Sequence, residues 1–293
     1  MECKEQSGAA LGGAIEDVRV LRRLKVKEGF TGVGVDEGAS VCAVVDVETT
    51  GLDPESDAVI QLAMRRFRYD AEGVITRIGK PWVWFEDPGR PIPPKITELT
   101  GIRDDDVTGR RFPDEDVVTA LTHVTAVVAH NADFDRKCIE RRFPAAKGLP
   151  WACTLNDIPW CRHKLDGGKL GFLGMQCGFF YEAHRADVDV DAVIALLRHR
   201  FEDGRTALSV MMENAQAPGW LVRADGAAFE VKDRLRARGY RWDPNHRVWA
   251  KEVRDAERFE EEAWLAANIY TTDARPRALG PSFEHRTWRQ RYA

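Results

Sequence analysis

The sequence predicts an α/β domain with a mixed β-sheet flanked by helices, followed by a small α+β domain. Three apolar segments lie close together early in the chain, at 41–48, 58–67 and 82–85, which favours antiparallel pairing. Helical and strand patterns then alternate, as expected for a sheet with helices on its faces. After Pro218-Gly219 the composition becomes basic and aromatic, which indicates a second, smaller unit.

The first strand is expected at 41–48, because VCAVVDVE is nearly all apolar and β-branched, as in strands covered on both faces. A second strand at 58–67 precedes a turn at Glu72-Gly73, and a third strand follows at 82–85. Ahead of them, apolar residues at helical spacing predict a helix over 15–24 that is appended to the main domain.

The rest of the chain alternates helices and strands, bounded by Pro, Gly and polar residues. The expected order is helix 95–100, helix 114–121, strand 124–129, helix 134–142, strand 151–155 and helix 188–201. The predicted organisation is an N-terminal helical extension at 1–38, the α/β domain at 39–205, a linker at 206–222, a small basic and aromatic domain at 223–270 and a basic tail at 271–293.

The charge of the chain is distributed unevenly. The 293 residues include 43 Lys and Arg against 47 Asp and Glu, a formal net charge of −4. A mildly acidic chain is a poor first candidate for binding nucleic acid. However, segment 223–254 holds nine Lys and Arg against five acids, and segment 271–293 holds five Arg against two acids. The C-terminal region therefore suits a polyanionic partner.

Several classes of protein are disfavoured by composition. The 44% of hydrophobic residues argues against a wholly disordered chain. No apolar run reaches the roughly 18–20 residues that span a bilayer, and the N-terminus lacks the pattern of a secretory signal. The six cysteines form no C-x-x-C pair, so a zinc knuckle is not indicated. We expect reduced thiols in a cytoplasmic protein.

Asp46 and Glu48 lie at the end of the first strand, just before a Thr-Thr-Gly turn. Side chains two apart in a strand share one face, so the two carboxylates are expected to project together. Such a pair repels unless a cation lies between them, and all-oxygen ligands suit Mg²⁺ or Mn²⁺. A pair of solvated acids at a strand end is the alternative, because D-x-E alone is common.

Two further polar segments follow strand-to-helix or loop-to-helix junctions. They are HNADFD at 130–135 and HRADVD at 184–189. On a regular helix, His184 and Asp189 would lie about 140° apart. A shared site therefore requires His184 on the preceding loop and Asp189 on the first helical turns.

The segments VVDVETTGLD, HNADFD and HRADVD resemble the three motifs of the DnaQ-like, DEDDh 3'→5' exonucleases, and they occur in the family's order. PIPPKITELTGI is similar to the segment between the first two motifs in proofreading-type members. The resemblance covers about residues 40–202 and implies a ribonuclease H-like sheet. Arg185 stands where the tyrosine branch of the family would have Tyr, so the histidine branch is favoured.

The resemblance implies roles for individual residues. The catalytic and metal-binding acids would be Asp46, Glu48, Asp135 and Asp189, with His184 taking a proton from the attacking water. Contacts to the terminal nucleotide are implied for Thr49, Thr50, Leu52 (as a wedge against the last base), Thr100, His130 and Asn131. Asp133 and Asp191 lie near the motif positions and are expected not to be ligands.

The implied activity is two-metal hydrolysis of phosphodiester bonds from the 3' end of nucleic acid, releasing nucleoside 5'-monophosphates. Single-stranded DNA or 3' ends are favoured, with Mg²⁺ or Mn²⁺ as cofactors. RNA as the substrate, a polymerase or repair partner, and a catalytically idle nucleic-acid-binding subunit all stay open. A haloacid-dehalogenase-like phosphatase with Asp46 as nucleophile is a weaker alternative, because that family needs D-x-D and Glu48 stands at the second position.

The domain at 223–270 interleaves basic residues with aromatic ones, a pattern that suits single-stranded nucleic acid through phosphate attraction and base stacking. In the other interpretation, Tyr240, Trp242 and Trp249 form the small core of this domain and the basic residues cover its surface. Under both interpretations the basic surface is expected to aid substrate binding.

Overall fold

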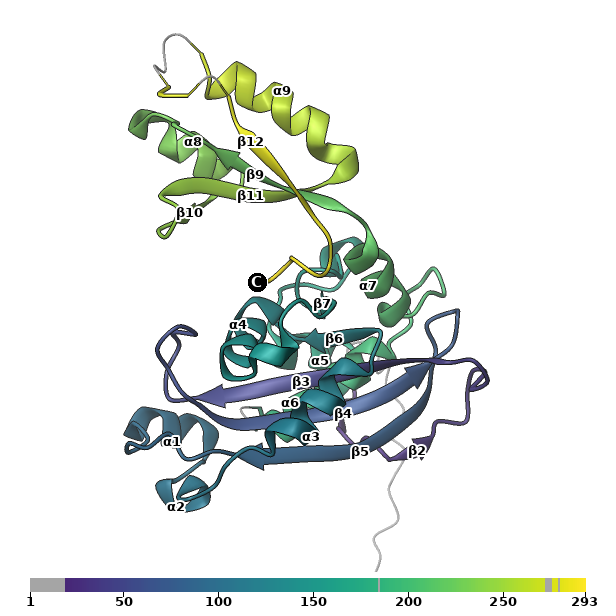
Figure 1. Ribbon diagram of the computed structural model, residues 1–293. Helices are drawn as coiled ribbons and strands as arrows, with labels where there is room; N and C mark the ends of the chain where they lie inside the picture. The colour runs from purple at the N-terminus through teal and green to yellow at the C-terminus, as the bar shows by residue number, and fades with distance from the viewer. Residues whose placement is uncertain (1–18, 184, 272–275, 279) are drawn as a thin grey trace, which may run out of the picture.

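The computed structural model describes residues 19–183, 185–271, 276–278 and 280–293, and Figure 1 shows their arrangement. The chain forms a six-stranded mixed sheet with helices on both faces, and a separate four-stranded antiparallel sheet near the C-terminus. The predicted fold class is confirmed. In the described part of the chain, no helix is long and apolar enough to cross a membrane.

The six-stranded sheet has the order β2-β5-β4-β3-β6-β7. The central strand β3 pairs antiparallel with β4 and parallel with β6, so the strand direction changes across β3. A short turn joins the antiparallel strands β4 and β5, whereas a crossover that contains a helix joins the parallel strands β6 and β7. The strands are β2 (Gly29–Phe30), β3 (Ser40–Thr49), β4 (Val59–Tyr69), β5 (Ile75–Phe85), β6 (Ala126–Ala129) and β7 (Trp151–Cys153).

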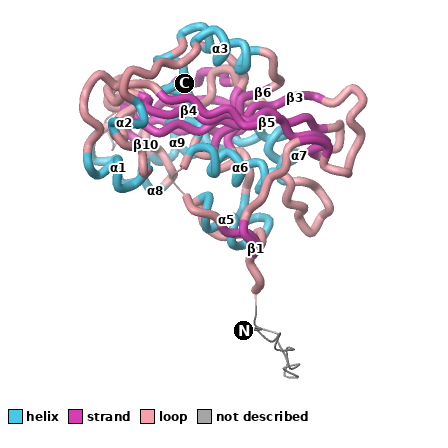
Figure 2. Tube along the Cα trace, turned by 90° about the horizontal axis from the view of Figure 1, so that it is seen from below, coloured by secondary structure: helices cyan, strands magenta, loops and turns pink. Residues whose placement is uncertain are grey.

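Alternating side chains of β3 pack into two different cores. Cys42 and Val44 pack with residues of α5, α6 and α7, while Ala43 and Val45 pack with residues of α3 and α4. Figure 2 shows the strands nearly edge-on, with α3 on one side and α5 and α6 on the other. The helices are α1 (Pro94–Thr100), α2 (Asp104–Val107), α3 (Asp114–Thr122), α4 (Ala132–Arg142), α5 (Leu170–Gln176), α6 (Ala186–Leu197) and α7 (Ala207–Gln216).

The helix predicted over 15–24 is wrong for its described part, residues 19–24. Arg22–Arg23 instead forms strand β1, which pairs parallel with β8 (Phe179–Phe180). The backbone N–H groups of Arg22 and Leu24 donate to the carbonyls of Gly178 and Phe180, so pairing with a distant segment overrides the local apolar spacing. Residues 15–18 lie outside the described residues.

The C-terminal sheet has the order β10-β11-β9-β12, and its core includes Val222, Tyr240, Leu265 and Ile269. The buried Tyr240 supports the interpretation that part of the aromatic set forms the core. The elements are β9 (Gly219–Ala224), α8 (Lys232–Ala237), β10 (Arg241–Asp243), β11 (Val248–Arg254), α9 (Arg258–Asn268) and β12 (Ser282–Arg286).

Two predicted segments have more structure than expected. Residues 206–222, predicted as a linker, contain α7 and the start of β9, and α7 buries Leu208 and Met211 against the first domain. Residues 271–293, predicted as a tail, contain β12, which pairs along its whole length with β9. Sequence patterns missed both elements because each depends on packing against a distant surface rather than on a strong local pattern.

Residues 287–292, here called the C-terminal strap, return from the small domain to the first domain. The guanidinium of Arg136, buried on α4, donates to the carbonyls of Arg291 and Arg289, the latter at 2.8 Å. Further bonds run from Trp151 N to Trp288 O (2.9 Å), from Tyr292 Oη to Asp157 Oδ1 (2.9 Å) and from the Arg291 guanidinium to the carbonyls of Asn214 and Ala217 (2.9 Å each). The strap therefore ties the two sheets together.

We expect Arg136→Ala to lower the free energy of unfolding by about 3 kcal/mol, because it leaves buried carbonyls and the Glu140 carboxylate without their partner. The matched control is Lys137→Ala on the same helix, which removes only an exposed pair with Asp133 and should cost less than about 0.5 kcal/mol. Urea unfolding of the two variants measures the difference. Equal stabilities would contradict the role of the strap.

Candidate active site

The two acids predicted at the end of β3 do share a face. Asp46 and Glu48 alternate with Val45 and Val47, which pack into the core formed with α3 and α4. Their carboxylates therefore project toward the opposite side of the sheet, where α6 packs. β3 shifts its register with β4 between Glu48 and Thr49, so regular pairing ends directly after the two acids.

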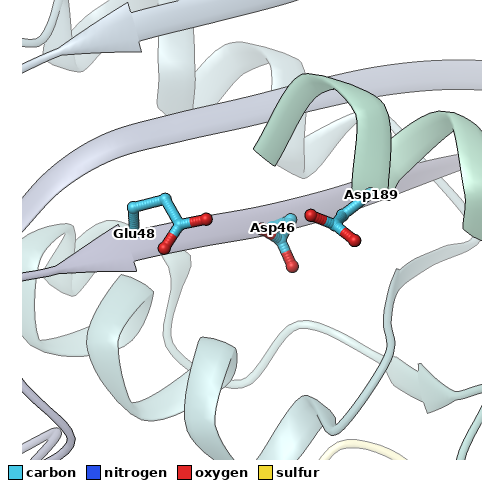
Figure 3. Close-up of side chains that lie close together, drawn as sticks. All are labelled: Asp46, Glu48 and Asp189. Carbon is cyan, nitrogen blue, oxygen red and sulfur yellow. The ribbon is translucent and has the colours of Figure 1, made fainter. Parts of the chain in front are cut away.

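Asp189 completes a cluster with these two residues. It lies on the first turns of α6, as the spacing from His184 required. One carboxylate oxygen each from Asp46, Glu48 and Asp189 lies within 4.8 Å of the others. Figure 3 shows the Asp189 carboxylate beside that of Asp46, with the Glu48 side chain turned toward them along β3. Residues more than 140 positions apart thus meet at one point.

Asp135 approaches the same strand from α4, which follows the parallel neighbour β6. Its carboxylate is buried, and its Oδ1 accepts a hydrogen bond of 3.1 Å from the backbone N–H of Val47, between the two acids of β3. The negative charge of Asp135 is, after burial, the leading cause that raises the pKa of Asp46. The structure therefore brings the four predicted acids to one end of β3.

Burial and mutual repulsion shift the pKa values of these acids upward. Burial is the largest cause for Asp46, followed by the charges of Asp135, Asp189 and Glu48, and its pKa lies well above the ordinary value. Burial and the charge of Asp189 raise the pKa of Glu48 to about 7. Burial also raises the pKa of Asp135, against the hydrogen bond from Val47. In the described part of the chain, the charges that act on Asp46 are therefore all negative.

A divalent cation fits this environment. The donors are carboxylate oxygens, which Mg²⁺ and Mn²⁺ prefer, and a cation among them would hold the acids in their ionised forms. The alternative of solvated acids does not match the burial of Asp135 and Asp189 or the partial burial of Asp46. Asp46, Glu48 and Asp189 are placed to share an ion, and Asp135 is the fourth acid beside them.

His184 lies outside the described residues, so its predicted role stays a prediction. Its neighbours are described: the N–H of Arg185 donates to Asp189 Oδ2 at 3.1 Å, and the Tyr181 hydroxyl donates to Asp189 Oδ1 at 3.0 Å. Sequence reasoning missed Tyr181. It stands eight residues before Asp189, a spacing that no motif marks, and β8 and the following loop bring its ring to the cluster.

The two acids near the motif positions have other partners. Asp133 is exposed and pairs with Lys137 one turn along α4, at 3.1 Å. Asp191 pairs with the buried guanidinium of Arg65 on β4, at 2.5 Å. Neither belongs to the acidic cluster, which agrees with the expectation that they are not ligands. The Arg65–Asp191 pair instead fixes α6 against the sheet.

The turn after β3 is closed by Thr50 and Asp57. The Thr50 hydroxyl donates to Asp57 Oδ1 at 2.9 Å and accepts from Ala58 N at 3.0 Å and from Arg90 Nη2 at 2.9 Å. At Gly51 a Cβ would lie 2.3 Å from the Asp57 carboxylate, so a larger residue there would displace that side chain from Thr50. Thr49 donates to the carbonyl of Gly51 at 2.5 Å. Both threonines are buried in this turn, and their substrate contacts stay predictions.

The other predicted substrate residues differ in exposure. Leu52 is 86% exposed at the tip of the turn, as a wedge requires. Thr100 is buried at the end of α1, where its hydroxyl donates to Ile96 O at 2.9 Å. His130 bridges Thr154 Oγ1 (2.8 Å) and Gly168 O (2.7 Å), so both its ring nitrogens are engaged within the protein. Asn131 begins α4 in a left-handed conformation, with φ 79°.

The raised pKa of Glu48 predicts a pH-dependent stability. The folded metal-free protein keeps the Glu48 proton up to about pH 7, whereas the unfolded chain loses it near the ordinary value of 4.5. The folded state binds more protons in this window, so its stability falls as pH rises through it. Cation binding needs the ionised form, so stabilisation by Mg²⁺ should be larger at about pH 8 than at about pH 6.

Melting temperatures with and without Mg²⁺ at the two pH values measure this effect. Glu48→Gln is the control, because it removes the carboxyl group that titrates. The contribution of this group to the pH dependence of the melting temperature should then disappear. An Mg²⁺-induced shift that is the same at both pH values would contradict the prediction.

Comparison with known proteins gives one family and several relatives. A family model described as an exonuclease, RNase T, matches residues 43–197. DNA polymerase III subunit epsilon of Treponema pallidum is 27% identical over 184 residues, which are 59% of this chain and 82% of that protein. DNA polymerase III PolC-type of Clostridium perfringens is 27% identical over 205 residues, which are 64% of this chain and 14% of that protein. The chain thus spans a small part of the PolC-type polymerases that it matches.

Solved structures of exonucleases are also similar to this chain. A zinc-bound exonuclease I–single-stranded DNA complex from E. coli is 19% identical, with a TM-score of 0.48 over 85% of this chain and 63% of that one. Exonuclease X in complex with 5'-overhanging duplex DNA is 24% identical, with a TM-score of 0.42 over 54% of this chain and 89% of that one.

Proposed function

Because the chain belongs to the RNase T/DnaQ-like family of exonucleases, we propose that it removes nucleotides from the 3' end of nucleic acid with two divalent metal ions. The observation that carries the proposal is the meeting of Asp46, Glu48 and Asp189 within 4.8 Å, beside the buried Asp135. Four acids at one strand end have little use in a purely structural role, since each raises the pKa of its neighbours.

Bound ions would activate a water and stabilise the charge on the leaving 3' oxygen. The chain's own part is to hold and orient the reactants. Asp46 lies between the other acids and is the ligand we expect to be shared by both ions. The Val47 N–H fixes one oxygen of Asp135, and the Tyr181 hydroxyl fixes one oxygen of Asp189. Such bonds restrict the carboxylates to a few orientations.

We assign proton transfer from the attacking water to His184. In the sequence it directly precedes Arg185, whose backbone N–H donates to Asp189 at the start of α6. A histidine with a pKa near neutrality can accept this proton at physiological pH. The products would be a nucleoside 5'-monophosphate and a strand shortened by one nucleotide.

The substrate we favour is single-stranded DNA or a single-stranded 3' end. Leu52 is exposed on the turn after β3, where an apolar side chain can stack against the last base. The similarity to a DNA polymerase III epsilon subunit supports DNA, while RNA or short oligonucleotides are the second candidate. A catalytically idle subunit is disfavoured because all four acids are present and gathered at one strand end.

A set of labelled substrates with Mg²⁺ tests the proposal. It contains single-stranded DNA, duplex DNA, single-stranded RNA and very short oligonucleotides, each with a label at the 5' end. We expect a ladder of products shortened stepwise from the 3' end, with the highest rate on single-stranded DNA. Hydrolysis of none of these substrates, or release of the 5' label as the first product, would overturn it.

Two further assignments belong to this proposal. The similarity to a polymerase III epsilon subunit suggests a polymerase as the partner, with a repair complex as the alternative. Among the described residues the five cysteines are unpaired, which suits the reducing cytoplasm.

A further inference from the structure

The small C-terminal domain has a pocket of about 1030 Å³ that the proposed activity does not use. Phe229, Trp242 and Trp249 line it together with Arg247 and Arg277, and Glu230 is the one acid among its lining residues. It lies between β10–β11 and the loop after β9, at the edge of the core of the domain, from which Ala224 and Trp249 contribute to its lining.

Two of the three aromatic side chains of this pocket, Phe229 and Trp242, are exposed, while Trp249 packs partly against the core. Trp242 is 49% exposed and Phe229 is 73% exposed, although the core of the same domain buries Tyr240. The planes of the Trp242 and Trp249 rings are inclined to each other by 65°, and the ring centroids lie 5.7 Å apart. Large exposed aromatic faces in one concave site mark a binding surface, because burial would otherwise stabilise the small domain.

The cationic side chains in and around the pocket indicate an anionic ligand. Among the described residues, no carboxylate pairs with Arg247 or Arg277. Two more cations lie over the aromatic rings: Lys232 Nζ is 3.8 Å from the Phe229 centroid, and Arg236 Cζ is 5.7 Å from that of Trp249. Alternating aromatic and cationic groups match the alternating bases and phosphates of a single strand.

The backbone of Arg247 gives an independent argument. This residue has φ 52°, a left-handed conformation in which glycine is favoured and a side chain is strained. The turn between β10 and β11 keeps an arginine there, and its side chain lines the pocket. Because glycine would adopt this conformation without strain, the presence of an arginine indicates that its positive charge has a function.

The pocket also lies on the appropriate side of the molecule. In Figure 1 the β10–β11 hairpin and the arrowhead end of β3, the end that carries the acids, both lie on the left of the view, the hairpin in the upper sheet and β3 in the lower one. The strap holds the small domain in this orientation. A strand with its 3' end at the acids can therefore extend toward the pocket.

We propose that the pocket formed by Phe229, Trp242, Trp249, Arg247 and Arg277 is a second binding site for single-stranded nucleic acid, which holds the strand upstream of the 3' end being hydrolysed. The inference rests on the proposed function for the polarity of the strand. Binding at the pocket itself is measured without hydrolysis, so the two proposals can fail separately.

The test compares Trp242→Ala, Arg247→Gly and wild type in the full chain. Both variants should fold, because Trp242 is half exposed and glycine relieves the strained backbone at position 247. Arg241→Ala is the matched control: it removes an exposed cation from the same hairpin, and Arg241 does not line the pocket. Fluorescence anisotropy in EDTA measures the affinity for labelled oligothymidylates of about 20 and about four nucleotides.

We expect Trp242→Ala and Arg247→Gly to bind the longer strand about tenfold more weakly, with little change for the shorter one. Arg247→Gly should also reduce the slope of log affinity against log salt by about one. Hydrolysis of the shorter strand in Mg²⁺ should be unchanged in both variants. The Arg241→Ala control should match wild type throughout.

Wild-type affinity for the longer strand in both variants would overturn the second site. The second site would also be overturned if free mononucleotide displaced the strand completely. The same holds if the variants lost as much affinity for the shorter strand as for the longer one, because the pocket would then not be an upstream site. A wild-type protein that binds strands through the pocket but hydrolyses none would instead overturn the proposed function.

Discussion

Asp46→Asn is expected to lower the rate of hydrolysis by about a thousandfold or more, because several kcal/mol of transition-state stabilisation depend on the cations that Asp46 would share. The protein should stay folded. Burial and three neighbouring negative charges oppose ionisation of Asp46, so an uncharged amide relieves repulsion in the metal-free protein. Single-turnover hydrolysis and thermal melting of the variant measure the two effects.

The matched control for Asp46→Asn is Asp133→Asn. Asp133 lies two residues from Asp135 on α4, but it is exposed and pairs only with Lys137 in a surface ion pair. We expect near-normal rates for this variant. Comparable losses in both variants, or near-normal hydrolysis by a folded Asp46→Asn protein, would sink the assignment of the acidic cluster as the catalytic centre.

Removal of divalent ions should abolish hydrolysis, and addition of Mg²⁺ or Mn²⁺ should restore it. The cluster of Asp46, Glu48 and Asp189 contains only carboxylate oxygen donors, and burial with mutual repulsion keeps the pKa of Asp46 well above its ordinary value. Without a cation, burial and repulsion oppose the ionised carboxylates, and no Lewis acid is present to assist a phosphoryl transfer. The expected loss is at least about a thousandfold.

The readouts are a hydrolysis assay after dialysis against EDTA and a titration back with each metal. Affinity for the longer oligonucleotide in EDTA is the control, because the pocket in the small domain contains no metal-binding cluster among the described residues. Undiminished hydrolysis in excess EDTA would contradict a metal-dependent mechanism.

The sequence predicts the acidic site well because its signals are local. Asp46 and Glu48 share a face through the period of two along β3, and the dense apolar run around them fixes that strand without reference to the rest of the chain. The assignment of Asp189 comes from the resemblance of HRADVD to the family's third motif, and the structure has this residue on the first turns of α6. Strand-to-helix junctions then bring Asp135 to the same end of the sheet.

The parts that the sequence does not predict depend on contacts between distant segments. Tyr181 reaches Asp189 only through the loop that follows β8, and its spacing matches no periodic pattern. β12 is a strand because β9 offers it a free edge, and β1 is a strand because β8 does. The strained backbone conformation of Arg247 also cannot be predicted from the residue type.

The strap has a consequence for the order of events during synthesis. Arg136 and its acceptor Arg291 are 155 residues apart, so the ribosome releases α4 well before the segment that satisfies its buried guanidinium. Contacts of such large sequence separation form late and slow folding. Until the strap is synthesised, the first domain of the nascent chain therefore lacks the strap's contacts with α4, the helix that carries Asp135. Once the strap has formed its contacts, the two sheets should unfold in a single cooperative transition, so damage within residues 287–292 should also destabilise the end of the sheet that carries the four acids.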